Sequence, residues 1–196
     1  MLKIGITGGI GTGKTTVCRI FETLGIPVFN ADEESKKMLM EDAEVARAVK
    51  AVFGASVYHD NVLNKKELAA IVFSDPEKLA KLNAITHPAV FRKFEAWCSL
   101  KQQASYVIKE AALIYEAGAD AALDAVIVVT APEALRLKRV ARRDRVSDED
   151  IRLRMKHQWP EEEKIKRAKF IIHNDEEHLL IPQVLTIHHT LLHEPD

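Results

Sequence analysis

The stretch GGIGTGKTT at residues 8–16 restricts the possible folds of this chain more than any other feature. Four glycines in nine positions form a composition too flexible to serve core packing. The apolar residues 2–7 before it read as a short buried strand, and residues 17–24 after it repeat apolar side chains on one helical face. The order strand, glycine loop, helix predicts a unit of an α/β fold.

The loop also carries a chemical pattern. Gly8, four further residues, and then Gly13, Lys14 and Thr15 match the phosphate-binding sequence G-x-x-x-x-G-K-[ST]. Backbone N–H groups of such a loop turn toward an anion, and the N-terminus of the following helix adds partial positive charge. We therefore expect Lys14 to reach the β- and γ-phosphates of a nucleotide and the Thr15 hydroxyl to coordinate Mg²⁺. The pattern alone does not separate GTPases, motor ATPases and small-molecule kinases.

Later apolar runs, separated by helical segments, predict the remaining strands of a parallel sheet. These runs are residues 26–29, 106–108, 125–130 and 169–173. The predicted architecture is one α/β domain over residues 1–196, a P-loop NTPase-type parallel sheet with helices on both faces. Residues 65–103 predict a helical insertion, and the charged residues 136–168 predict a second one.

Composition narrows the partners and the compartment. The net charge is -1 and the pI is about 6.7, so the chain has no general attraction to nucleic acid or an anionic membrane. Cys18 and Cys98 lie far apart, and the sequence has neither a signal-peptide pattern after Met1 nor an apolar stretch long enough to span a bilayer. We expect a cytoplasmic protein that binds small molecules, as a monomer or weak homo-oligomer.

Asp32 is a candidate for catalysis because it follows the second predicted strand. Ligands of parallel sheets bind beyond the carboxyl ends of the strands, where this carboxylate would face the phosphates. A structural reading is equally open, since Asn30 and Glu33 have the spacing of a capping box and Asp32 would favour the helix dipole.

Nearly the whole chain resembles the dephospho-CoA kinases. The matching stretches, in chain order, are residues 4–32, FG at 53–54, VFSDPEKLAKLNAITHP at 72–88, LIYE at 113–116, RLKRVARRD at 136–144, Gln158 and FIIHN at 170–174. The resemblance implies an enzyme that uses ATP and Mg²⁺ to phosphorylate the 3′-hydroxyl of the dephospho-CoA ribose, the last step of coenzyme A synthesis. It also implies that the helical insertion binds the acceptor and that residues 136–168 form a lid.

The resemblance assigns roles to particular residues. Asp32 matches the second acid of the family and would be the catalytic base, whereas the family's first acid is replaced by Asn30. The lid arginines would be Arg139 and Arg143, which stand one helical turn apart. Together with Lys14 and Asp32 they would be the catalytic residues. The substrate-binding residues would be Asp32, His87 and Glu116. The nucleotide-binding residues would be Gly11, Thr12, Gly13, Lys14, Thr15, Thr16 and Asn174.

Other readings of these features remain open. The basic run at 136–145 can be a solvated helix face paired with the acids at 148–150, or a nucleic-acid stripe. His87 before Pro88 can mark a helix boundary. Glu110 can hold a water on Mg²⁺ or be a surface acid. The alternative functions are a P-loop kinase for another nucleotide-like acceptor and a nucleotide-sensing NTPase.

Overall fold

The structure is a computed structural model that describes residues 1–60, 62–73 and 75–193; residue 74, within the predicted insertion, lies outside the described residues. The chain divides into two compact units, a sheet unit of Met1–Asn30 with Lys101–Asp196 and a helical unit of Ala31–Leu100.

The sheet unit carries its strands and helices in alternation. They are β1 (Leu2–Thr7), α1 (Lys14–Thr23), β2 (Val28–Asn30), β5 (Tyr106–Glu110), the 3₁₀ turn η2 (Ala119–Ala122), β6 (Ala125–Thr130), α6 (Glu133–Asp144), α7 (Asp148–Met155), α8 (Glu161–Arg167), β7 (Phe170–His173) and α9 (Leu180–His193).

The strands of this unit pair in the order β2-β5-β1-β6-β7, and every pairing is parallel. Ile4 of the central strand β1 stands opposite Ile108 of β5 and Ala125 of β6. Both neighbours are buried along their whole length, as expected for a parallel sheet with helices on its two faces.

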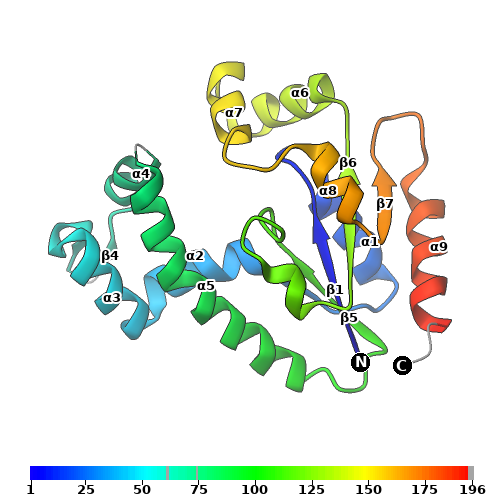
Figure 1. Cartoon of the computed structure of the whole chain (residues 1–196), viewed down its shortest axis with the longest axis horizontal. Helices are drawn as coiled ribbons and strands as arrows, with labels where there is room; N and C mark the ends of the chain where they lie inside the picture. Colours follow the sequence, from blue (N-terminus) through cyan, green and yellow to red (C-terminus); the bar gives the residue numbers. More distant parts are fainter. Residues whose placement is uncertain (61, 74, 194–196) are drawn as a thin grey trace. The chain divides into compact units, whose positions relative to one another are not determined.

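Separate apolar clusters fill the two faces of the sheet. On one face, side chains of α1 and α9, among them Phe21 and Ile187, pack against Ile6 of β1. On the other, Ile165 of α8 packs against the cluster that contains Val128 of β6. The predicted parallel sheet with helices on both faces is therefore confirmed (Figure 1).

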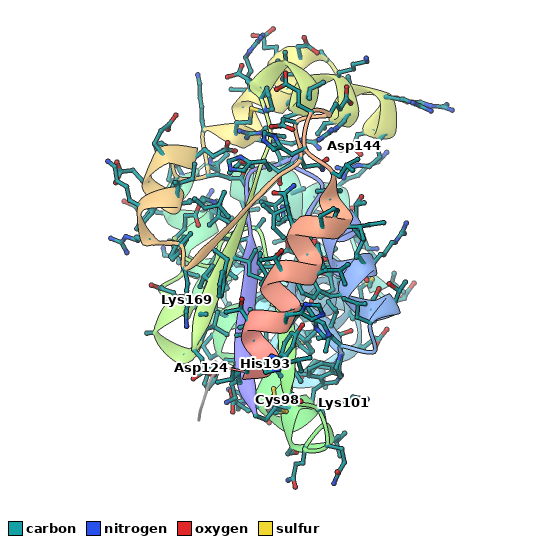
Figure 2. All side chains as sticks on the ribbon, turned by 90° about the vertical axis from the view of Figure 1, so that its right-hand side faces the viewer. Cys98, Lys101, Asp124, Asp144, Lys169 and His193 are labelled. Atoms are coloured by element: carbon teal, nitrogen blue, oxygen red, sulfur yellow. The ribbon has the colours of Figure 1, made fainter. Side chains whose placement is uncertain are left out.

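The phosphate loop lies at the end of the sheet unit where the parallel strands have their carboxyl ends. Figure 1 shows α6 and α7 beyond the carboxyl ends of the strands, and Figure 2 labels Asp144, the last residue of α6, at this end. Asp124 lies at the opposite end in Figure 2, where its carboxylate accepts the backbone N–H of Lys3 at 2.6 Å. The phosphate loop follows the carboxyl end of β1, so it belongs to the end that carries α6 and α7.

The helical unit is built from short helices around one long helix. Its elements are α2 (Ala31–Glu41), α3 (Ala43–Phe53), the 3₁₀ turn η1 (Ala55–Val57), β3 (Tyr58–His59), β4 (Val62–Leu63), α4 (Lys65–Phe73) and α5 (Pro76–Ser99). The predicted insertion at 65–103 covers only α4 and α5 of this unit, and the unit itself begins at Ala31. The single kinase domain, the acceptor-binding insertion and the lid stay predictions.

One of the two open readings of His87, a helix boundary, is wrong, because α5 continues through Pro88. A proline inside a helix costs about 3 kcal/mol through its missing N–H and its ring. Burial opposes this cost: Val90 and Phe94, which follow the proline on the buried side of α5, each contribute about 1.5–3 kcal/mol. The Thr86 hydroxyl also donates to the Leu82 carbonyl at 3.2 Å within the same helix.

Candidate active site

The phosphate loop, residues 8–13, connects β1 to α1 as predicted. Gly11 and Gly13 have left-handed backbone conformations, with φ of 81° and 92°. A side chain at Gly11 would come within 2.6 Å of the Arg136 carbonyl oxygen, and one at Gly13 would overlap the Asn174 side-chain nitrogen. Besides their backbone freedom, these glycines therefore let distant segments approach the loop closely.

Side chains of the loop bind its own backbone. The Lys14 ammonium donates to the carbonyls of Gly8 and Gly9 at 3.0 and 3.4 Å. The Thr12 hydroxyl, fully buried, donates to the same Gly9 carbonyl at 2.9 Å. Thr16, in the first turn of α1, donates its N–H to the Gly13 carbonyl at 2.9 Å. All predicted loop residues thus lie together at the start of α1.

Glu110, the last residue of β5, joins three elements at one carboxylate. Its Oε1 accepts the Thr15 hydroxyl at 3.0 Å, and its Oε2 accepts the Asn30 amide at 3.0 Å. Burial and then the neighbouring Glu110 charge raise the pKa of the Cys18 thiol far above its usual range. Glu110 is only 6% exposed, so the surface-acid reading is wrong. A carboxylate beside the Thr15 hydroxyl suits a divalent cation.

Asn174 follows β7 and binds the loop directly. Its side-chain nitrogen donates to the Thr12 carbonyl at 2.7 Å, and its own carbonyl accepts Arg139 at 3.0 Å. The Arg139 guanidinium also forms an ion pair with Glu176 at 3.5 Å. The structure therefore brings together Asn174, which the resemblance assigns to nucleotide binding, and Arg139, which it assigns to catalysis.

Arg143 has a different setting from Arg139. It pairs with Asp144 at 2.7 Å, its side chain is 66% exposed, and its hydrogen bond is the main reason why the pKa of Asp144 is lowered. Arg154 binds the same carboxylate at 3.2 Å. The sequence predicted equal roles for the two arginines, but Arg139 contacts Asn174 beside the phosphate loop, whereas Arg143 contacts acidic Asp144.

Two residues that received no role from the sequence also bind the loop. Arg136 Nε donates to the Ile10 carbonyl at 3.0 Å, and Gln158 Oε1 accepts the Ile10 N–H at 2.8 Å. Arg136 stands one turn before Arg139 on α6, a spacing that could have drawn attention to it. Gln158 shows no local pattern, because its contact joins residues far apart in the chain.

Glu116 lies at a buried ion pair. Its Oε1 is 2.7 Å from the Lys164 ammonium and accepts the Trp159 N–H at 2.8 Å. Lys164 is 1% exposed and also donates to the Ala112 carbonyl at 3.2 Å. Among the described residues, the second Glu116 oxygen is buried with no hydrogen-bond partner. Glu116 thus fastens the segment between α7 and α8, and its binding of substrate stays a prediction.

Asp32 and His87 belong to the helical unit. Asp32 is exposed in the first turn of α2, beside the acidic Glu33 and Glu34, which suits the N-terminus of a helix. His87 is exposed on α5. Their catalytic and substrate-binding roles stay predictions.

The described part of the chain has no group of three or more His, Cys, Asp or Glu side chains suited to one metal ion. Within the same described residues, no helix has both the length and the apolar character needed to cross a membrane. A cation at this site would need oxygen atoms from the bound substrate or water beside those of Thr15 and Glu110.

Known proteins resemble the chain in sequence and in fold. The profile of the dephospho-CoA kinase family matches residues 2–179. A dephospho-CoA kinase of Chlorobaculum tepidum is 43% identical over 181 residues, which cover 89% of this chain and 86% of the relative. A crystal structure of a Thermus thermophilus protein superposes with a TM-score of 0.87 at 33% identity and covers 98% of each chain. Dephospho-CoA kinase from Campylobacter jejuni superposes with a TM-score of 0.69 at 28% identity, over 96% of each chain.

Proposed function

Because the chain belongs to the dephospho-CoA kinase family, we propose that it transfers the γ-phosphoryl group of ATP to the 3′-hydroxyl of the dephospho-CoA ribose. The products are coenzyme A and ADP. The observation that carries the proposal is the complete phosphate loop between β1 and α1, with Lys14 and Thr15 at the start of the helix, in a chain matched by this family.

The sheet unit would bind ATP. The backbone N–H groups at the start of α1 and the Lys14 ammonium would hold the β- and γ-phosphates. Arg139 lies one contact away from the loop, through Asn174, and would neutralise charge on the γ-phosphoryl group during transfer. Arg143 would join it only after leaving Asp144.

Thr15 and Glu110 fit a magnesium ion. Mg²⁺ prefers oxygen ligands and keeps several waters in nucleotide sites, and these two side chains offer a hydroxyl and a carboxylate 3.0 Å apart. Thr15 would hold the ion, with Glu110 adding negative charge and accepting hydrogen bonds beside it. When bound there, the ion would supply positive charge to offset the charge that develops on the phosphates.

The acceptor would meet Asp32, His87 and Glu116. A ribose hydroxyl is a poor nucleophile, so Asp32 would orient it and accept its proton. A bond forms between the 3′-oxygen and the γ-phosphorus, while the bond from that phosphorus to the β–γ bridging oxygen breaks and ADP leaves. Asn30 cannot act as the base, because an amide does not accept this proton, and its amide binds Glu110.

For its surroundings, we propose a cytoplasmic enzyme that works as a monomer or weak homo-oligomer with small-molecule partners. A net charge of -1 gives no reason for nucleic acid to bind. Size-exclusion chromatography with light scattering over a range of concentrations tests the oligomeric state.

The function is tested by measuring ADP with ATP, Mg²⁺ and one acceptor at a time: dephospho-CoA, AMP, CMP or none. We expect ADP formation that depends on dephospho-CoA, and ³¹P NMR of the product with a new phosphate on the ribose 3′-oxygen. Lys14→Ala should abolish transfer while the circular dichroism spectrum stays normal. Equal ADP formation with every acceptor and without one would instead indicate an ATPase or a nucleotide-sensing protein.

A further inference from the structure

Ile10, in the middle of the phosphate loop, is engaged by α6, by α7 and by the residues after α7. Its N–H donates to Gln158 Oε1 at 2.8 Å, and its carbonyl accepts Arg136 Nε at 3.0 Å. Its side chain packs on the apolar cluster of α6 and α7 that contains Val140 and Ile151. Both backbone polar groups and the side chain of one loop residue are thus bound by residues more than a hundred positions away.

We infer that Gln158 is a positioning residue for ATP, because its amide oxygen holds the Ile10 peptide and keeps the loop in its nucleotide-binding conformation before ATP arrives. The inference deepens the proposed function and rests on it for the identity of the nucleotide. Glycine-rich backbone loses more conformational entropy on ordering than other sequences. A loop that is already ordered leaves less entropy to be lost on binding, so ATP binds more tightly.

Gln158 differs from the other residues that bind the loop. The carbonyls of Gly9, Ile10 and Thr12 accept hydrogen bonds from side chains of Thr12, Arg136 and Asn174. Gln158 instead accepts an N–H group, the kind of group that such a loop presents to phosphate. The Ile10 N–H is therefore not available to bind an anion. Its bond to Gln158 instead fixes the start of the loop, and the N–H groups after Ile10 are left to bind the phosphates.

The base from which Gln158 reaches the loop is itself fixed. Its own N–H donates to the Met155 carbonyl at 3.0 Å, and the next residue, Trp159, donates its N–H to Glu116 at 2.8 Å. The Trp159 ring stacks on Tyr115 with 6.3 Å between centroids. A glutamine whose own backbone and next residue are both anchored can hold the loop with little loss of side-chain entropy at the time of binding.

The test measures ATP affinity without acceptor, by calorimetry with a non-hydrolysable ATP analogue and Mg²⁺. Gln158→Met keeps the side-chain volume but removes the acceptor, and we expect its Kd to rise about 3- to 10-fold, the effect of one neutral hydrogen bond. Gln102→Ala, an exposed glutamine in the turn after α5, is the control and should bind like the wild type.

Steady-state kinetics separates positioning from a catalytic or merely structural role. For Gln158→Met we expect KM for ATP to rise with its Kd, while kcat at saturating ATP and KM for dephospho-CoA change less than about twofold, as for the loss of uniform binding. An unchanged Kd in a folded Gln158→Met protein, with or without a lower Tm, would overturn the inference.

A measurement on the wild-type protein covers the case in which the variants do not fold. Hydrogen exchange at the Ile10 amide should be slow before nucleotide is added, because the amide is already bonded. Exchange at the rate of an open loop until ATP is added would contradict a preformed loop. The calorimetry measures nucleotide binding without any acceptor. Its result therefore tests the role of Gln158 even if the proposed acceptor, dephospho-CoA, is wrong.

Discussion

Asn30 and Glu110 form a hydrogen bond between an amide and a carboxylate, so the two groups can be swapped by the substitutions Asn30→Asp and Glu110→Gln. We predict that each single substitution lowers the free energy of unfolding and that the double variant recovers most of the loss. Asn30→Asp places a carboxylate oxygen where the amide nitrogen stands, 3.0 Å from Glu110 Oε2. Glu110→Gln places an amide nitrogen beside the amide nitrogen of Asn30. Two hydrogen-bond donors then face each other, and no hydrogen bond forms unless one of the amides flips. In the double variant the amide of residue 110 donates to the carboxylate of residue 30, and its oxygen still accepts the Thr15 hydroxyl.

The magnitudes follow from the distance and the burial. Two unit charges 3.0 Å apart repel by about 5 kcal/mol at an effective dielectric constant of 20, and a shared proton relieves part of this. We therefore expect Asn30→Asp to lower the free energy of unfolding by about 2–4 kcal/mol near about pH 8. Glu110→Gln should lower it by about 1–2 kcal/mol, the difference between charged and neutral hydrogen bonds. The double variant should return to within about 1 kcal/mol of the wild type.

Urea unfolding of the four proteins measures this cycle, and pH gives a second signature. In Asn30→Asp the native pair binds a proton more strongly than the unfolded chain does, so its destabilisation should shrink from about pH 8 to about pH 5.5. Glu110→Gln should also weaken Mg²⁺-dependent ADP binding by about 10- to 100-fold, as for loss of a group that supports a metal ligand. Single effects that add within about 0.5 kcal/mol would refute the reasoning, because they would leave no coupling between the two side chains.

Two further predictions address the transfer step. Arg139→Ala should lower kcat by about three orders of magnitude if it neutralises the γ-phosphoryl charge, whereas Arg143→Ala should do so only if that arginine leaves Asp144 for the ligand. Normal turnover in both variants, measured by ADP release, would show that these arginines only form a solvated face of α6. Asp32→Asn should leave the Tm and ATP binding near normal and lower kcat by about two to four orders of magnitude, because the amide caps a helix but accepts no proton. Asn30→Ala is its control, and a larger loss of kcat there than in Asp32→Asn would show that the catalytic position is wrongly assigned.

The sequence predicted the sheet and the loop because both depend on local pattern. Residues 2–7 and 125–130 are strands with the predicted bounds, and GGIGTGKTT lies between a strand and a helix as its motif requires. The continuation of α5 through Pro88 was missed because it depends on burial against other elements, which no local rule contains. The role of Glu110 stayed open for the same reason, since its partners Thr15 and Asn30 are brought to it by the parallel pairing of β5 with its neighbours.

The basic run of α6 shows what spacing can and cannot predict. Residues one helical turn apart share a face; from the sequence this rule groups Arg139 and Arg143, and it holds equally for Arg136. Their contacts nevertheless differ: Arg136 binds the Ile10 carbonyl, Arg139 binds Asn174, and Arg143 binds its neighbour Asp144. The difference follows from what surrounds each position: the phosphate loop lies beside Arg136, Asn174 lies beside Arg139, and the last residue of α6 lies beside Arg143. Helical spacing therefore groups these arginines, but only the segments packed around α6 decide that Arg136 and Arg139 hold the phosphate loop and Asn174, while Arg143 holds the end of its own helix.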